Sequence, residues 1–162
     1  MTNDLHLVPM ARSGFDDGVP IAVDVYAEGL IRNQHVDATA ARAAGEKAVA
    51  DLFPQGIDTP GMLFFDGLAD GVKIGWVWLA LKSLNTSHIY MIFVMEGSRG
   101  RGHGRALIQA VERELVGRGV RQITLNVFAY NESARRLYQS VGFKPVSQLM
   151  TKTINNCREP LM

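Results

Sequence analysis

One short segment of the chain, Arg99-Gly-Arg-Gly-His-Gly-Arg105, alternates glycine with basic residues. A turn with so little side-chain bulk lets a ligand approach its main-chain N–H groups closely. Residues 89–94 before the turn are apolar and typical of a strand, and residues 107–115 after it carry apolar residues at helical spacing. A helix that begins at the turn directs its free N–H groups and positive dipole end to the same place. The segment therefore predicts a site for a phosphate-like anion, reinforced by arginine.

Two familiar phosphate-binding patterns do not fit this segment. A P-loop places Lys and then Ser or Thr after its second glycine, whereas His103 and Gly104 follow Gly102 here. The dinucleotide-binding pattern Gly-x-Gly-x-x-Gly differs from Gly100-x-Gly-x-Gly104 in its last interval. A glycine-rich turn is a weak signal by itself, so a solvated basic turn before an ordinary helix also fits these residues.

Two motifs together resemble those of a known family. The segment Arg99-x-x-Gly-x-Gly104 is similar to the acyl-CoA pyrophosphate loop of the GCN5-related N-acetyltransferases, Gln/Arg-x-x-Gly-x-Gly/Ala. The later segment Asn131-x-x-Ala-x-x-x-Tyr138, followed by Gly142-Phe143, matches the second motif of that family. The motifs occur in the order and at the separation typical of the family, over about residues 89–145. On this basis the chain is identified as a member of the GCN5-related N-acetyltransferase (GNAT) family.

The resemblance implies a reaction and a set of binding residues. The reaction is transfer of the acetyl group of acetyl-CoA, as co-substrate, to a primary amine by direct attack on the thioester in a ternary complex. A main-chain N–H near Val94 would polarise the thioester carbonyl, and one such donor contributes roughly 3 kcal/mol in other acyl-transfer enzymes. The cofactor-binding residues that the resemblance implies are Phe93, Val94 and Met95 along the pantetheine arm, Arg99, Gly100, Arg101, Gly102, His103, Gly104 and Arg105 around the pyrophosphate, and Asn131 on the following helix.

Tyr138 is the candidate catalytic residue. The family places this tyrosine where its hydroxyl can hydrogen-bond to or protonate the departing thiolate. A thiol with a pKa of about 8.5 is already a fair leaving group, so we expect a modest contribution. The spacing of Ala134, Leu137, Tyr138 and Val141 alone predicts a buried stripe, which leaves a core role open.

The sequence assigns no general base. An alkyl amine is almost wholly protonated at pH 7, so its proton must be removed before attack. Many relatives carry a glutamate in the strand before the loop, whereas residues 89–94 contain no carboxylate. Glu96 lies just past the end of this strand, Glu28 lies on the first expected helix and His88 precedes the strand. Each is more typical of a solvated polar residue. The missing carboxylate leaves a second hypothesis open, a CoA-binding regulatory module without turnover.

The bulk composition narrows the class of protein. The chain has 162 residues, of which 47% are hydrophobic and 20% charged, as in one soluble domain over residues 1–162. A net charge of +1 argues against nucleic acid as a partner, and so does an arginine-rich segment limited to the single turn 99–105. No stretch suits a membrane. The single cysteine, Cys157, suggests a passive thiol and a cytoplasmic protein. We expect a small-molecule, peptide or protein amine as acceptor, no metal, and a monomer or homodimer.

The expected elements agree with the fold that the resemblance implies, a mixed α/β GNAT fold. In that fold a central mixed, mostly antiparallel sheet is flanked by helices on both faces, and two parallel strands part to admit the pantetheine arm. Trp76 and Trp78 face one side of their strand, either along an acceptor groove or against a helix. The expected strands are 5–8, 62–65, 73–81, 89–94, 122–128 and 146–154, and the expected helices are 19–33, 38–53 after an Asp37 N-cap, one from the glycine turn to about Arg118, and 133–141.

Overall fold

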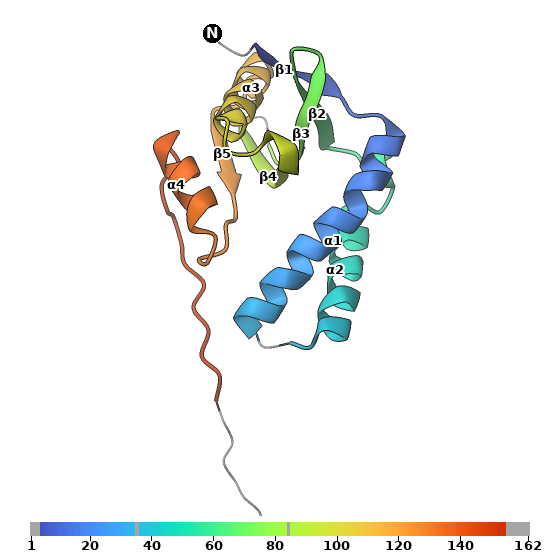
Figure 1. Ribbon diagram of the computed structural model, residues 1–162, viewed down its shortest axis with the longest axis vertical. Coiled ribbons are helices and arrows are strands. Elements are labelled where there is room, and N and C mark those ends of the chain that lie inside the picture. The colour runs from blue at the N-terminus through green and yellow to red at the C-terminus, as the bar shows by residue number, and fades with distance from the viewer. Residues whose placement is uncertain (1–3, 35, 84, 155–162) are drawn as a thin grey trace, which may run out of the picture.

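The computed structural model of the protein describes residues 4–34, 36–83 and 85–154 (Figure 1). Cys157 lies outside these residues. Two short 3₁₀ turns, η1 (Gly56–Asp58) and η2 (Glu96–Ser98), interrupt the loops. The strands and helices, in chain order, are β1 (Leu5–Pro9), α1 (Arg12–Gln34), α2 (Ala38–Leu52), β2 (Met62–Ala69), β3 (Val72–Leu81), β4 (Thr86–Val94), α3 (His103–Gly117), β5 (Gln122–Leu125) and α4 (Glu132–Ser140).

The five strands form one sheet in the order β1-β2-β3-β4-β5. The first three pairings are antiparallel, and β4 pairs with β5 in parallel through the α3 crossover. Asp70 and Gly71, with φ of 51° and 76°, connect β2 to β3. Positive φ at both positions suits a two-residue hairpin turn. The sheet is therefore mixed and mostly antiparallel, as predicted.

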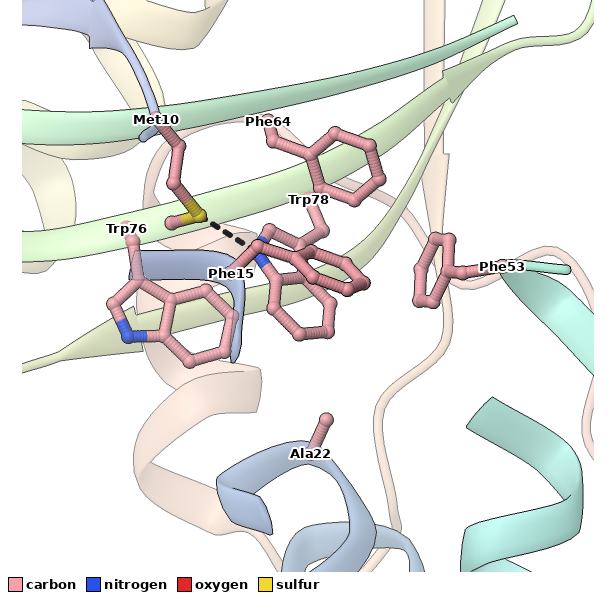
Figure 2. Close-up of a cluster of buried hydrophobic side chains, with 7 residues drawn as sticks. All are labelled: Met10, Phe15, Ala22, Phe53, Phe64, Trp76 and Trp78. Atoms are coloured by element: carbon pink, nitrogen blue, oxygen red, sulfur yellow. Dashed lines mark hydrogen bonds between the residues drawn. The ribbon is translucent and has the colours of Figure 1, made fainter. Parts of the chain in front are cut away.

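Helices cover both faces of the sheet (Figure 1). One face packs under α1 and the end of α2 through an aromatic cluster that includes Phe15, Phe53, Trp76 and Trp78 (Figure 2). The other face packs against α3 through Val111 and its neighbours. Because successive side chains of a strand point to opposite faces, each central strand supplies both clusters.

The two tryptophans belong to the core and line no groove. Trp76 and Trp78 are 2% and 0% exposed, and Trp78 Nε1 donates to Met10 Sδ at 3.4 Å (Figure 2). A Cβ on Gly18 would lie 2.7 Å from the Trp78 ring, so α1 approaches the sheet closely at this glycine. Of the two roles that the alternation allowed, the structure shows packing against a helix.

Helix α1 begins earlier than predicted. We expected its start at residue 19, where a stripe of apolar residues at helical spacing begins. The helix instead begins at Arg12 and contains Pro20. Phe15 stacks on Trp78 with ring centroids 4.9 Å apart, so tertiary packing outweighs the weak local propensity.

The predicted last strand at residues 146–154 is wrong: in the described part of the tail these residues form no strand. The tail instead runs away from the body after α4 (Figure 1). Strand β5 is also shorter than predicted and ends at Leu125. A strand requires a neighbour for its backbone hydrogen bonds, and neither segment has one where the prediction failed.

Candidate active site

The candidate site lies where β4 and β5 part. Their pairing covers Thr86–Ile89 with Gln122–Leu125, whereas β4 continues to Val94. On the β3 side the register shifts at this point, because Trp78 pairs with Met91 and Leu79 with Ile89. Tyr90 is therefore the extra residue of a β-bulge, which bends a strand and increases its twist. Beyond Ile89, β4 has no strand neighbour on its β5 side within the described residues.

Two main-chain N–H groups of β4 face the space beside β5. The Met95 N–H donates to the Ile74 carbonyl of β3 at 2.8 Å. Backbone groups of successive strand residues alternate in direction, so Val94 and Ile92 point away from β3. The Val94 carbonyl accordingly accepts from Arg99 Nε at 3.0 Å on that side. The Ile92 and Val94 N–H groups therefore point toward the side where β4 has no strand neighbour among the described residues, and a ligand that runs along β4 could accept from them.

The glycine turn is open and presents a row of free amides. Gly100 and Gly102 have φ of 73° and 80°, in the left-handed region that favours glycine. A Cβ at either position would meet nothing within 4 Å. The first bond of the following helix runs from the Ala106 N–H to the Gly102 carbonyl at 3.1 Å. Among the described residues, the N–H groups of 100–105 have no acceptor, and Gly102 provides no side-chain cap.

The basic side chains of the turn are less uniform than the sequence suggested. Arg99 folds back onto β4, where its guanidinium lies 5.3 Å from the centre of the Phe93 ring. Arg105 Nη2 donates to Ser140 Oγ of α4 at 2.7 Å. His103 is buried at the start of α3, and Arg101 is exposed. Two of the four side chains thus brace the site, and the free donors of the turn are mainly main-chain groups.

The three predicted binding residues at the end of β4 differ in their burial and in the direction of their side chains. The Phe93 ring stacks on Trp76 with centroids 5.4 Å apart, so it belongs to the core face. Val94 is half-buried with its backbone toward the open side, and the side chain of Met95 is 38% exposed. Within this trio, the Val94 backbone is the group best placed to meet a ligand.

Helix α4 packs over the first turn of α3. A Cβ on Gly104 would lie 2.9 Å from Leu137 Cδ2 and 3.9 Å from Val94 Cγ2. The glycine therefore lets Leu137 approach α3 closely beside the end of β4. Asn131 caps α4, because its Oδ1 accepts from the Ala134 N–H at 3.2 Å. The contact of Asn131 with a cofactor stays a prediction.

Tyr138 is half-buried at the inner side of α4. Its ring packs edge-on against Phe143 at 5.7 Å, and no residue of α4 is fully buried. Burial raises the pKa of the Tyr138 hydroxyl above its usual 10.0. The group therefore stays protonated at neutral pH and is available as a donor. In the described chain the hydroxyl has no hydrogen-bond partner.

His88 occupies a more defined position than its sequence context suggested. Its Nδ1 lies 2.7 Å from Thr124 Oγ1, across the β4–β5 pairing. Thr124 also donates toward the Ser87 carbonyl at 3.4 Å. A hydroxyl has one proton to donate, so this contact favours Nδ1–H on the histidine and a free lone pair on Nε2. Burial and then the positive charge of Lys82 lower the pKa of His88 below 6.5.

The two carboxylates considered for the base are placed less favourably. Glu28 forms an exposed ion pair with Arg32 on α1 at 2.7 Å, and Glu96 lies exposed in η2. The sequence did indicate His88 as a candidate base, because it directly precedes the apolar residues 89–94. Its partner Thr124 is 36 residues away and was not predicted.

An aromatic bridge that the sequence did not reveal joins the loop after β5 to α1. Phe128 presses on Gly29, whose Cβ would lie 2.2 Å from the ring. Tyr130 stacks on Phe128 at 5.4 Å, and the Arg32 guanidinium lies 4.6 Å from the centre of the Tyr130 ring. Desolvation, followed by the nearby Glu28, raises the pKa of Tyr130. The bridge therefore lies on the α1 side of the sheet, and His88 faces this side.

Comparisons with known proteins agree with this architecture. Residues 31–143 match the model of the acetyltransferase (GNAT) family. YycN of Bacillus subtilis strain 168, an uncharacterised N-acetyltransferase, is 27% identical over 152 residues, which cover 91% of this chain and 97% of YycN. The crystal structure of YycN has a TM-score of 0.88 at 26% identity and covers 94% of this chain and 99% of that one.

Two further relatives are more distant. A mycothiol acetyltransferase of Beutenbergia cavernae is 40% identical over 78 residues, which cover 48% of this chain and 26% of that protein. The aminoglycoside N-acetyltransferase AAC(6')-Iy, in a complex with CoA, has a TM-score of 0.52 at 19% identity. That likeness covers 95% of both chains and shows the fold.

The mixed sheet, with helices on both faces and two parallel strands that part, is an architecture that this chain shares with YycN, a putative acetyltransferase. The chain belongs to the GNAT family of acetyltransferases, as its two motifs indicated. Members of this family use acetyl-CoA. No helix among the described residues combines the length and apolarity that crossing a membrane requires. The described residues also contain no group of three or more metal-ligating side chains.

Proposed function

We propose that the protein transfers the acetyl group of acetyl-CoA to a primary amine of a small molecule, peptide or protein. The observation that carries this proposal is the row of N–H groups at residues 100–105, which have no acceptor among the described residues and are continuous with the start of α3. A diphosphate suits such a place, because several donors and the helix dipole converge on it. Arg101, which is exposed beside the row, adds a positive charge.

The parted strands supply a path from this turn into the sheet. The Ile92 and Val94 N–H groups face the open side of β4. A pantetheine arm along β4 would place its amide and thioester carbonyls against these donors. A donor aimed at the oxygen where negative charge develops lowers the barrier, by roughly 3 kcal/mol in related chemistry.

Tyr138 and His88 would manage the two protons of the reaction. As the C–N bond forms and the C–S bond breaks, the amine loses a proton and the sulfur needs one. Tyr138 is protonated at neutral pH and would donate to the sulfur. His88 is neutral at that pH, and its Nε2 would accept the amine proton directly or through one water.

The acceptor would enter on the α1 side of the sheet. Ile89 packs in the α3 cluster, so His88, its neighbour in the strand, faces the opposite side. The bridge of Phe128 and Tyr130 to α1 borders the same side. The aromatic rings of Phe128 and Tyr130 give this border an apolar surface, which suits an amine with an apolar or aromatic portion.

Calorimetric titration with CoA tests the binding half of the proposal. We expect one site per chain and a weaker affinity, by tenfold or more, in Gly100→Ala, because φ of 73° disfavours any residue with a Cβ. Gly117→Ala, at the far end of α3 with open space around its Cβ, is the control and should bind normally. A folded wild-type protein that gives no heat with CoA would end the proposal.

Mass spectrometry tests the transfer half. A mixed library of small amines and peptides, incubated with the protein and acetyl-CoA, should contain products heavier by one acetyl group. Binding of CoA without any acetylated product across the library would restrict the protein to CoA binding.

A further inference from the structure

A lysine and a tyrosine lie beside the candidate base His88 on the α1 side of the sheet. The Lys82 Nζ donates to the Tyr90 hydroxyl and lies 5.0 Å from the centre of the Tyr90 ring. The rings of His88 and Tyr90 meet edge-on, with centroids 4.7 Å apart. Tyr90 also packs against the aromatic cluster under α1, where its ring lies 6.3 Å from that of Phe53. Lys82, Tyr90 and His88 therefore form one polar cluster, here called the Lys82 cluster.

The Lys82 cluster carries a positive charge that no carboxylate balances within the described residues. Lys82 is exposed and belongs to none of the ion pairs of the described chain. Burial and then the charge of Lys82 lower the pKa of His88, and no carboxylate opposes this shift. An acceptor amine reaches the protein mostly as an ammonium ion. A simple amine is therefore repelled at the place where it must lose its proton.

The hydrogen-bonding groups of the Lys82 cluster suit a carboxylate. A lysine ammonium has three protons, of which Tyr90 accepts one. The other two, together with the proton of the Tyr90 hydroxyl, have no acceptor among the described residues. A carboxylate has two oxygens that only accept, and its bonds to a charged donor are stronger than neutral ones. Because Nε2 of His88 accepts, donors for an anion and an acceptor for an amine proton lie side by side.

We infer that the acceptor is an amino acid, whose carboxylate binds Lys82 and the Tyr90 hydroxyl while its amine reaches His88. This inference rests on the proposed function, since it specifies the acceptor of that reaction, and the products are an N-acetylamino acid and CoA. The carboxylate offsets the charge of Lys82, whereas a second amine in its place would be repelled. The aromatic border of Phe128 and Tyr130 would receive the side chain, which favours apolar and aromatic amino acids.

Binding of the products tests the carboxylate site without requiring turnover. The CoA-loaded protein is titrated in a calorimeter with the N-acetyl derivatives of leucine, methionine and phenylalanine, each beside its uncharged amide. We expect at least one acid to bind tenfold or more tightly than its amide. Lys82→Met should abolish this preference and Lys82→Arg should retain most of it. Lys47→Met, which removes an exposed lysine paired with Asp51 on α2, is the matched control. Equal affinity for acids and amides, or no binding of either, would overturn the inference.

Histidine NMR tests whether Lys82 acts on the base. Because its charge lowers the pKa of His88, Lys82→Met should raise that pKa, and Lys47→Met should not. An N-acetylamino acid bound to the wild type should raise it as well. An unchanged pKa of His88 in Lys82→Met would place the lysine too far from the base for one small acceptor to reach both.

Acetyl transfer separates a failure of this inference from a failure of the proposed function. For at least one of the three amino acids, kcat/KM should exceed that of its amide by tenfold or more, mainly through KM. Tyr90→Phe keeps the ring contact with Phe53 and should lose part of this preference. If amides and simple amines react as well as the acids, the inference fails and the proposed function stands. If CoA binds and no amine is acetylated, the proposed function fails, and the titrations with N-acetylamino acids still decide whether the carboxylate site exists.

Discussion

Gly104→Ala tests whether the contact between α4 and α3 sets the geometry of the site. The new Cβ would lie 2.9 Å from Leu137 Cδ2, closer than carbon atoms approach without a shift. Overpacking of this kind costs about 1–3 kcal/mol in a packed interior. Two effects reduce that cost here: the contact is with the flexible end of a leucine, and alanine gains up to about 1 kcal/mol of helix propensity over glycine. We therefore expect the free energy of unfolding to change by no more than about 1 kcal/mol.

The effect on catalysis should be larger than the effect on stability. Leu137 adjoins Tyr138, so any movement that relieves the clash moves the tyrosine hydroxyl as well. A displacement of about 1 Å in a reacting group can lower a rate by about a hundredfold. We expect kcat to fall about tenfold, which corresponds to about 1.4 kcal/mol in the activation barrier. Steady-state kinetics with an identified acceptor, alongside thermal unfolding, provides the measurement.

Two variants separate this reasoning from a general loss of fold. Gly117→Ala places a Cβ in open space in the same helix, and should leave kcat unchanged. Leu137→Val removes the clashing methyl, so the double variant Gly104→Ala with Leu137→Val should recover part of the lost rate, as a coupled pair does in a mutant cycle. If Gly104→Ala behaves like Gly117→Ala in both assays, the glycine does not position α4 and the reasoning is refuted.

Further predictions concern single side chains of the site. Tyr138→Phe keeps the packing on Phe143 and should lower kcat about tenfold with CoA affinity unchanged, whereas an unaltered kcat would make the tyrosine a packing residue. For the wild type, kcat/KM should fall as the pH drops through the lowered pKa of His88, below 6.5, in the field of Lys82 and beside the Tyr90 ring. His88→Gln should remove that acidic limb, and an unchanged profile would exclude this base. Asn131→Ala should lower the free energy of unfolding by about 1 kcal/mol through loss of the α4 cap, with Asn131→Asp close to wild type, as chemical denaturation would show.

The elements that the sequence predicted well are those with local signals. Asp37 caps α2, as predicted, through a bond from the Ala40 N–H at 2.9 Å. The hairpin turn at Asp70-Gly71 comes later than predicted, because β2 runs to Ala69 and not to residue 65. The third helix ends at Gly117, close to the predicted end at about Arg118, and Gly119 follows with φ of 82°. Each of these depends on one residue type in one backbone conformation, and such a preference can be predicted from a short stretch of sequence.

The elements that it missed depend on partners distant in sequence. The early start of α1 follows from Phe15 stacking on Trp78, a contact across 63 residues that no local pattern encodes. The expected strand at 146–154 has the right composition, but a strand exists only where an edge accepts it. Contacts between residues distant in sequence were missed at the candidate site as well. The glycine turn was evident, whereas Arg105 bonding to Ser140 and His88 bonding to Thr124 arise only when α4 and β5 are in place.

The three glycines of the turn satisfy three different physical requirements, and this explains why glycine alternates with larger residues there. Gly100 and Gly102 have positive φ, and Gly102 also leaves the start of α3 without a side-chain cap that would compete for its amides. Gly104 has ordinary helical backbone but must admit Leu137. The intervening Arg99 and Arg105 tie the turn to β4 and α4. A Cβ at Gly100 should therefore act on CoA affinity, and one at Gly104 on kcat. If the glycines served only one property of the loop, such as its flexibility, then Gly100→Ala and Gly104→Ala would each change both the CoA affinity and kcat.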